Sequence, residues 1–456
     1  MKVLKYIPKY IILFGLLICA TPLVFSQGSF RLPDGDKRDK ISFKLVNNLV
    51  VIPVEVNGTT LSFLLDTGVK STIIFSLEKQ DSVMLRNTEP INLRGLGNGG
   101  VLKGLKSENN FLKIGEAVSE DHTIYVIFES SLNLSSRMGI PINGIVGLDF
   151  FKNFIVKTNY RSKKIKFYKP ENYSYRECRK CDVFDLHFYK DKPYIDFVVG
   201  LNNATKEETV TLLLDSGSSD AVWLFDPKGF LTEAPKNYFE DFLGLGLSGH
   251  IYGRRSRLKK VIAGDFELED VNVAFPNKEA IDSLGLYIER DGSLGGDFLK
   301  RFTVTMDYPN KKVMLRRNGN FNDPFHYNMS GLTLEHDGVE VYKENSVQTS
   351  INQRAENSVS GFANRVNSST FNSFLRTEIL LVPRYVVAEI RKNSIADKSG
   401  ILIGDEILEI NGKPAHEYKL YNLSALFSSE EGKKIDLKIK RNQRIFDVRF
   451  KLEKVL

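Results

Sequence analysis

The arrangement of apolar and polar positions along this chain predicts short β-strands rather than long helices. Two apolar segments, 50–56 and 61–65, are separated by Asn57-Gly58, a dipeptide typical of a tight hairpin turn. Similar hairpins are expected at 154–168 and 302–315, each with a polar and basic turn. The fold class that follows from this pattern is mainly β.

These segments belong to an internal repeat. Residues 149–156 match residues 297–304 at an offset of 148, and residues 64–68 match residues 213–217 at an offset of 149. Because the spacing between the matching segments differs by only one residue between the copies, 83 against 82 from the aspartate of the first segment to that of the second, we expect two similar β lobes in a pseudo-twofold arrangement. A short helix is expected after Gly147 in the first copy and after Gly295 in the second.

A different pattern begins after residue 318. Strands are expected at 385–390, 406–410, 435–441 and 446–452, and helices at 394–399 and 418–427. This pattern predicts an α/β domain, and its Ser-, Asn- and Gln-rich segment at 344–373 predicts a mobile loop. The expected order is a signal peptide at 1–26, lobes at 27–170 and 171–320, and the α/β domain at 321–456.

The N-terminal segment is typical of an export signal. Three lysines precede an apolar run at 11–25, and small residues allow cleavage after Ser26. We therefore expect a periplasmic or extracellular protein. A retained membrane anchor is the alternative. Lipid attachment at Cys19 is disfavoured, because the bulky Ile18 stands where lipoprotein signals have a small residue.

Charge and cysteine content exclude several classes of function. The formal charge of +7 falls to +4 when the three signal lysines are removed, and this small excess does not indicate a nucleic-acid partner. The basic run at 254–260 is expected to form the solvated face of a strand. Cys178 and Cys181 are expected to form a disulfide or to remain two thiols. No second ligand pair accompanies them, so neither a zinc site nor a cofactor is predicted.

Two tripeptides carry the candidate chemistry, Asp66-Thr67-Gly68 and Asp215-Ser216-Gly217. Each follows an apolar strand at the same place in the repeat, so the two aspartates can meet across the lobes. Two carboxyl groups about 3 Å apart share one proton. The charged one can then take a proton from water while the neutral one polarises a carbonyl group. The hydroxyls can cross-link the two loops, and the glycines allow close approach.

These motifs resemble the retropepsin-type and pepsin-type aspartic peptidases over residues 40–318. Each motif is followed about 80 residues later by an apolar-Gly element, at 145–147 and 293–295, as in those families. The short lobes are most similar to bacterial retropepsin-like proteins with two copies fused. The resemblance implies that Asp66 and Asp215 are catalytic, with support from Thr67, Gly68, Ser216 and Gly217. It also implies a polypeptide substrate, no metal and a monomer.

Two further features bear on this resemblance. The resemblance implies a flap hairpin in each copy, with Gly97, Asn98 and Gly99 in the first and Gly246 in the second; the alternative is a pair of surface hairpins.

Lys70 stands close to Asp66, where the family has a small residue. Its ammonium would disturb proton sharing if it faced the carboxyls, and would have no effect if it pointed outward. The alternative function is therefore a catalytically inactive, exported protein that binds peptides through its C-terminal domain or through the cleft between the lobes.

The C-terminal region resembles a bacterial PDZ domain at residues 393–400 and 404–412. This resemblance implies that Gly331, Leu332, Thr333 and Leu334 form a loop that binds the C-terminal carboxylate of a peptide. A purely structural or regulatory PDZ domain is the alternative.

Overall fold

The computed structural model describes residues 28–77, 82–93, 102–128, 133–175, 177–201, 207–225, 237–246, 249–278, 281, 289–353 and 369–456. The expected signal peptide at 1–26 lies outside these residues. Strands make up 56% of the structure and helices 9%, which confirms the mainly β prediction. Within the described part of the chain, no helix has the length and apolar character needed to cross a membrane.

Two eight-stranded sheets share one strand order, as the repeat predicted. The first runs in the order β2 (Lys44–Val46), β3 (Leu49–Val56), β4 (Thr59–Leu65), β9 (Gly144–Val146), β5 (Thr72–Ile74), β8 (Ala117–Ile127), β7 (Leu102–Ile114), β6 (Thr88–Leu93). The second runs in the order β13 (His187–Tyr189), β14 (Lys192–Leu201), β15 (Glu207–Leu214), β20 (Gly292–Leu294), β16 (Val222–Leu224), β19 (Phe266–Pro276), β18 (Gly249–Ala263), β17 (Phe239–Gly246). We call these two sheets, with their short helices, lobe 1 and lobe 2.

The β3–β4 hairpin shows how the local sequence forms a lobe. Asn57 and Gly58 both have positive φ, 47° and 89°, which is the turn geometry that the twist of two paired strands favours. From Ile52 to Val56 the side chains of β3 alternate: Ile52, Val54 and Val56 are buried, whereas Pro53 is exposed and Glu55 is half-buried. Strands with one face toward the core and one toward solvent therefore form each lobe.

A six-stranded sheet joins the lobes. Its order is β1 (Arg38–Ser42), β11 (Lys164–Tyr168), β10 (Ile155–Asn159), β21 (Phe302–Asp307), β22 (Lys312–Arg317), β12 (Cys181–Asp185). Lys157 of β10 pairs with Thr305 of β21, the residue 148 positions later in the repeat. A residue that pairs with its own repeat equivalent lies on the symmetry axis, so the pseudo-twofold axis passes between these two strands.

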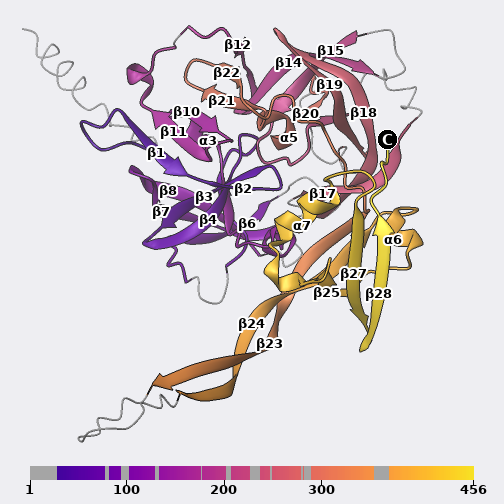
Figure 1. Ribbon diagram of the computed structural model, residues 1–456. Helices are drawn as coiled ribbons and strands as arrows, with labels where there is room; N and C mark the ends of the chain where they lie inside the picture. Colours follow the sequence, from indigo (N-terminus) through magenta and orange to yellow (C-terminus); the bar gives the residue numbers. More distant parts are fainter. Residues whose placement is uncertain are drawn as a thin grey trace, which may run out of the picture.

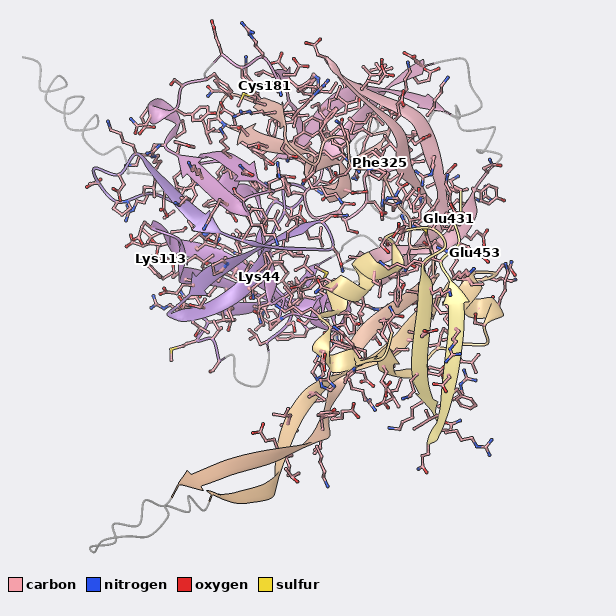
Figure 2. The ribbon with its side chains drawn as sticks, viewed as in Figure 1. Lys44, Lys113, Cys181, Phe325, Glu431 and Glu453 are labelled. Atoms are coloured by element: carbon pink, nitrogen blue, oxygen red, sulfur yellow. A yellow bond between two sulfur atoms is a disulfide. The ribbon has the colours of Figure 1, made fainter. Side chains whose placement is uncertain are left out.

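Short helices complete the lobes. They are α2 (Leu134–Met138), α3 (Leu148–Phe151), α5 (Gly296–Leu299) and the 3-10 helix η1 (Pro170–Asn172). Helices α3 and α5 follow Gly147 and Gly295, as predicted. Cys178 and Cys181 form a disulfide at the start of β12. Figure 2 places Cys181 far from Glu431 and Glu453 of the C-terminal domain.

The C-terminal domain contains a third kind of sheet, in the order β23 (Leu332–Gln353), β24 (Ser369–Ile390), β25 (Glu406–Ile410), β27 (Lys434–Arg441), β28 (Arg444–Lys451), with β26 (Lys413–Pro414) beside β25. Its helices are α6 (Ile395–Lys398), η2 (Ala415–Glu417) and α7 (Leu420–Phe427). The helices and strands predicted for this region are present. Figure 1 shows α7 on the side of the domain that faces the lobes.

One prediction for this domain was wrong. Of the loop predicted at 344–373, residues 354–368 lie outside the described residues, whereas residues 344–353 and 369–373 continue β23 and β24, in register as far as the pair Gln353–Ser369. Figure 1 shows this two-stranded ribbon extending away from the lobes. Each added pair satisfies backbone N–H and C=O groups and extends a ladder that is already formed, so polar composition alone did not prevent strand formation.

The basic run at 254–260 also differs from the prediction in one residue. Arg255 is buried rather than solvated, and its guanidinium pairs with Asp220 at 2.8 Å and with Asp241 at 2.9 Å. A buried cation requires such partners. Arg254 and Lys259 of the same strand are exposed, as expected.

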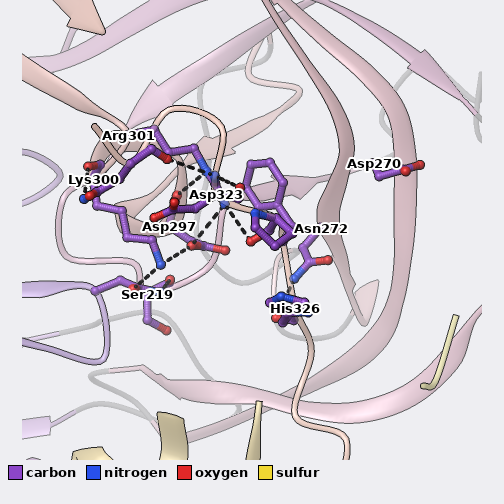
Figure 3. Close-up of polar contacts among 12 residues, drawn as sticks. Ser219, Asp270, Asn272, Asp297, Lys300, Arg301, Asp323 and His326 are labelled. Atoms are coloured by element: carbon purple, nitrogen blue, oxygen red, sulfur yellow. Dashed lines mark hydrogen bonds and ion pairs between the residues drawn. The ribbon is translucent and has the colours of Figure 1, made fainter. Parts of the chain in front are cut away.

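Arg301 anchors the segment that leads from lobe 2 to the C-terminal domain. Its guanidinium is buried at 1% exposure, donates to the carbonyl of Asp323, and lies 3.4 Å from the ring centroid of Phe325. Its Nε donates to the carbonyl of Asp297 at 3.2 Å. Figure 3 shows Arg301 with its hydrogen-bond partners Asp297 and Asp323. The repeat equivalent in lobe 1 is Asn153, so this anchor belongs to lobe 2 alone.

Candidate active site

The two aspartates occupy equivalent places in the two lobes. Asp66 directly follows β4, and its amide donates to the carbonyl of Val146 in the parallel strand β9 at 2.9 Å. Asp215 directly follows β15, and its amide donates to the carbonyl of Leu294 in β20, also at 2.9 Å. The apolar-Gly elements therefore lie beside the aspartate loops, and each fixes the point at which its loop leaves the sheet.

The aspartate side chains meet between the lobes. The carboxyl groups of Asp66 and Asp215 are within hydrogen-bond reach of each other. Each also accepts from a backbone amide of its own loop, from Gly68 at 2.7 Å and from Gly217 at 3.1 Å. A Cβ atom at Gly68 would lie 3.1 Å from the Asp215 carboxyl, and one at Gly217 would overlap the Asp66 carboxyl. Each glycine therefore makes room for the aspartate of the other lobe.

The hydroxyls of Thr67 and Ser216 link the two loops through four hydrogen bonds. Thr67 Oγ1 donates to the carbonyl of Leu214 at 2.6 Å and accepts from the Ser216 amide at 3.0 Å. Ser216 Oγ donates to the carbonyl of Leu65 at 2.9 Å and accepts from the Thr67 amide at 3.1 Å. All four bonds are buried and cross the lobe boundary, so they fix the spacing of the two carboxyls.

Burial and mutual repulsion favour a protonated carboxyl in this pair. Burial, and then the charge of Asp215, raises the pKa of the Asp66 carboxyl to about 8. Burial also raises the pKa of Asp215, but the charges of Arg290 and Lys192 oppose this rise. The arrangement therefore favours a proton on Asp66 and a negative charge on Asp215, so that one proton serves the pair at neutral pH.

Lys70 does not face this pair. Its ammonium forms an ion pair with Asp191 of lobe 2 at 2.6 Å, and 64% of its side chain is exposed. This pairing raises the pKa of Lys70, and Lys70 is not among the charges that shift the pKa of Asp66 or Asp215. The outward orientation leaves proton sharing undisturbed.

Two other cations act on the carboxyls, and neither was predicted from the sequence. Lys192 is the first residue of β14, and burial lowers its pKa while the two aspartates raise it. Arg290 is buried; its Nε donates to the carbonyl of Gly292 at 3.0 Å, and a terminal nitrogen donates to Ser293 Oγ at 2.6 Å. The charge of Asp215 opposes the lowering of the Arg290 pKa that burial causes.

Tyr308 also contributes to the site. Its hydroxyl donates to the carbonyl of Thr67 at 3.1 Å, and its ring stacks on Phe151 with centroids 5.4 Å apart. Burial raises its pKa well above the ordinary value, so the group is a neutral hydrogen-bond donor. In sequence it was visible only as the repeat equivalent of Tyr160.

Each lobe also contacts the aspartate loop of the other through a hairpin turn. Asn48, in the turn between β2 and β3, donates from Nδ2 to the carbonyl of Ser219 at 2.9 Å and accepts from Lys300 Nζ at 3.0 Å. Figure 3 shows Ser219 and Lys300 at this junction. The matching turn of lobe 2 contains Asp191, the partner of Lys70. Through these reciprocal contacts, the hairpin turn of each lobe holds the aspartate loop of the other lobe.

The flap predictions are only partly described by the structure. Gly97, Asn98 and Gly99 lie outside the described residues. Gly246 ends β17 and pairs with Gly249, so it stands at the turn of the β17–β18 hairpin, which we call the lobe 2 flap. Leu245 beside it packs against a buried apolar cluster of lobe 1, against which Val69 also packs. The lobe 2 flap therefore crosses to lobe 1 near the Asp66 loop.

In the C-terminal domain, the residues predicted to bind a peptide already make contacts within the domain. The side chains of Leu332 and Leu334 are buried in the core of the domain, and Thr333 is half-buried. The Gly331 amide donates to Asn328 Oδ1 at 3.0 Å, and the Leu332 amide donates to Ser330 Oγ at 3.0 Å.

The described residues contain no cluster of His, Cys, Asp or Glu that could hold a metal ion. A cavity of about 830 Å³ lies on the outer face of the six-stranded sheet, beside Lys166 and the Cys178–Cys181 disulfide. Neither aspartate lines this cavity, whereas the titratable groups with shifted pKa values converge between the lobes.

Comparison with protein families agrees with this geometry. Residues 52–150 match the aspartyl protease family, and residues 386–441 match the PDZ domain. The first match covers Asp66 and the lobe 1 strands around it; lobe 2 shares their strand order. A comparison with curated proteins gives no match.

Proposed function

Because this chain joins an aspartyl protease segment to a PDZ domain, we propose that it is an aspartic endopeptidase that hydrolyses extended polypeptides. Asp66 and Asp215 are the catalytic pair in this proposal. The observation that carries the proposal is that these two carboxyls, one from each lobe, are buried against each other, with their loops linked by hydrogen bonds of Thr67 and Ser216. Such a pair provides an acid and a base together at neutral pH.

In the proposed reaction, the Asp215 carboxylate takes a proton from a water molecule held between the two carboxyls. The resulting hydroxide attacks the carbonyl carbon of the peptide bond, and protonated Asp66 donates a hydrogen bond to the carbonyl oxygen as it becomes negative. The tetrahedral intermediate then collapses. The proton from Asp215 passes to the departing amine, and the products are one carboxyl and one amino terminus.

We further propose that the protein acts outside the cytoplasm. The positively charged, apolar N-terminal segment supports this location. The Cys178–Cys181 disulfide supports it as well, because such bonds persist in oxidising compartments.

The proposal is tested with fluorescein-labelled, denatured casein as an extended substrate. Asp66→Asn and Asp215→Asn should each lower kcat by at least about a thousandfold, because each removes the acid or the base. Both variants should melt no earlier than wild type at neutral pH, because each replaces a buried acid by a neutral side chain. Asp36→Asn, the same change at an exposed aspartate, should retain full activity.

Cleavage that persisted in both active-site variants would refute the catalytic pair. A wild-type protein that bound casein but did not cleave it, from acid to mildly alkaline pH, would support the alternative of a peptide-binding protein.

A further inference from the structure

The peptide-accepting side of the PDZ domain faces lobe 1 of the same chain. β23 is the edge strand of its sheet among the described strands, and α7 lies beside it. A PDZ domain takes a peptide as an added strand along such an edge, with the peptide carboxylate on backbone amides of the preceding loop. What occupies the loop and the edge here therefore decides what the domain can bind.

The loop amides are already bonded within the domain. The amides of Ser330 and Gly331 both donate to Asn328 Oδ1, each at 3.0 Å, and the Leu332 amide donates to Ser330 Oγ at 3.0 Å. An amide oxygen from the chain thus stands in the hydrogen-bonding position of an incoming carboxylate. Arg391 holds Asn328 in place by donating to its carbonyl at 2.9 Å.

Helix α2 of lobe 1 contacts both walls of the groove. On the strand side, Ser136 Oγ donates to the carbonyl of His336, and Arg137 pairs with Glu335 at 3.0 Å. On the helix side, Gly139 directly follows α2 and lies against α7. A Cβ atom at Gly139 would lie 2.5 Å from Leu420 Cβ. A peptide strand pairing with the β23 edge at His336 would therefore meet α2.

The lobe 2 flap joins the same contact. Arg137 lies over the ring of Phe242 in β17, 5.4 Å from its centroid, and also pairs with Glu389 of β24 at 3.5 Å. Tyr252 of β18 is hydrogen-bonded to Glu389 as well. A single carboxylate of the PDZ domain thus contacts both lobes.

An apolar cluster connects this contact to the candidate active site. Tyr421 of α7, Leu245 of the lobe 2 flap and Val69 beside the Asp66 loop all pack against one buried apolar cluster of lobe 1. Movement of α7 away from lobe 1 would expose part of this cluster and remove support from the flap.

We propose that the partner of the PDZ edge is α2 of lobe 1, so that the domain is an internal clamp on the lobe 2 flap. A peptide that adds a strand to β23 competes with α2 for the edge, and its binding releases the flap. The docking does not depend on catalysis; its effect on cleavage rests on the proposed function.

Hydrogen exchange of the full chain tests the clamp without requiring activity. Arg137→Glu replaces two attractive, partly buried ion pairs by repulsion. It should raise exchange rates at least about tenfold in three places at once: α2, residues 332–336, and the lobe 2 flap. Adding Glu335→Arg to this variant restores an ion pair at the same place and should slow exchange again at all three. Arg449→Glu, which breaks the exposed pair with Asp436 on the outer strands of the domain, is the matched control and should change none of them.

The proposal is overturned if residues 332–336 exchange in wild type as fast as in Arg137→Glu, or if the change stays confined to α2. Casein cleavage gives a separate result. Arg137→Glu should raise KM more than it lowers kcat, because a released flap holds substrate less well. If neither wild type nor variant cleaves casein, the proposed function fails while the exchange result still decides the clamp.

Discussion

Lys70 of lobe 1 pairs with Asp191 of lobe 2 at 2.6 Å, and the residue directly after Asp191 is Lys192, one of the two cations that act on the aspartate pair. The turn between β13 and β14 thus draws one lysine outward and places Lys192 inward. In lobe 1 the residue directly after the equivalent turn is Leu49, so the two lobes differ here in charge. The positive field at the site comes from lobe 2.

Removing this charge should move the pH profile of cleavage. Lys192 lowers the pKa of both carboxyls, so Lys192→Met should raise both. Wild-type activity should fall as pH rises through about 8, where Asp66 loses its proton. In Lys192→Met both limbs of the kcat/KM profile should lie at higher pH. Lys70→Met is the control and should leave the profile in place; an unmoved profile in Lys192→Met would contradict the assigned charge effect.

The Thr67 hydroxyl should matter more for stability than its size suggests. Thr67→Val keeps the shape of the side chain but leaves the Ser216 amide and the Leu214 carbonyl without their partner. Two buried groups without partners should lower the free energy of unfolding by about 2–4 kcal/mol. Urea denaturation followed by hydrogen exchange at the lobe boundary measures this loss. Thr60→Val, the same change at an exposed position of β4, should cost much less.

The repeat made this linkage predictable. Because Asp66 and Asp215, and Thr67 and Ser216, are equivalent positions in two similar modules, their meeting follows from symmetry. The contacts of Lys192 and Arg290 do not, because their counterparts in lobe 1 are Leu49 and Ile142. A charge that only one lobe carries leaves no repeat signal, and its approach to the site depends on how the lobes dock.

The C-terminal domain shows a second limit of the sequence. Its strands and helices followed from local patterns, because each has its own apolar face. For the extended ribbon at 344–353 and 369–373 the sequence predicts a loop, because polar composition carries no signal of backbone pairing. The docking of α2 on the C-terminal domain joins residues some 200 positions apart in the sequence. The periodicity of apolar residues reports only local structure, so it does not predict this contact.

The two glycines of the site should differ in their tolerance of a methyl group. A Cβ at Gly217 would overlap Asp66 Oδ2, whereas one at Gly68 would lie 3.1 Å from the nearest atoms of Asp215. Neither glycine has positive φ, so the clash alone decides. Gly217→Ala should lower kcat about a hundredfold or more by displacing the Asp66 carboxyl, and Gly68→Ala should lower it much less. Equal losses in steady-state assays of the two variants would show that backbone effects dominate.

His122 should make lobe 1 sensitive to acid. Its ring is fully buried, with Nε2 2.8 Å from Thr72 Oγ1 and Nδ1 2.9 Å from Ser119 Oγ, and burial lowers its pKa from 6.5 to about 4. Between these values the unfolded chain binds a proton that the folded lobe does not. Stability is therefore lost as pH falls from 6.5 toward 4, by about 3 kcal/mol in total.

Hydrogen exchange of β7 and β8 as a function of urea and pH measures this loss within lobe 1, so that unfolding of the other domains does not obscure it. His122→Gln, which does not titrate, should be less stable than wild type at neutral pH because the buried ring is lost, but should lack the decline between pH 6.5 and 4. His187→Gln, at an exposed histidine of lobe 2, should keep the wild-type decline. If His122→Gln declined as steeply as wild type, the acid sensitivity would have to arise from carboxyl groups, because the imidazole would then contribute no proton uptake on unfolding.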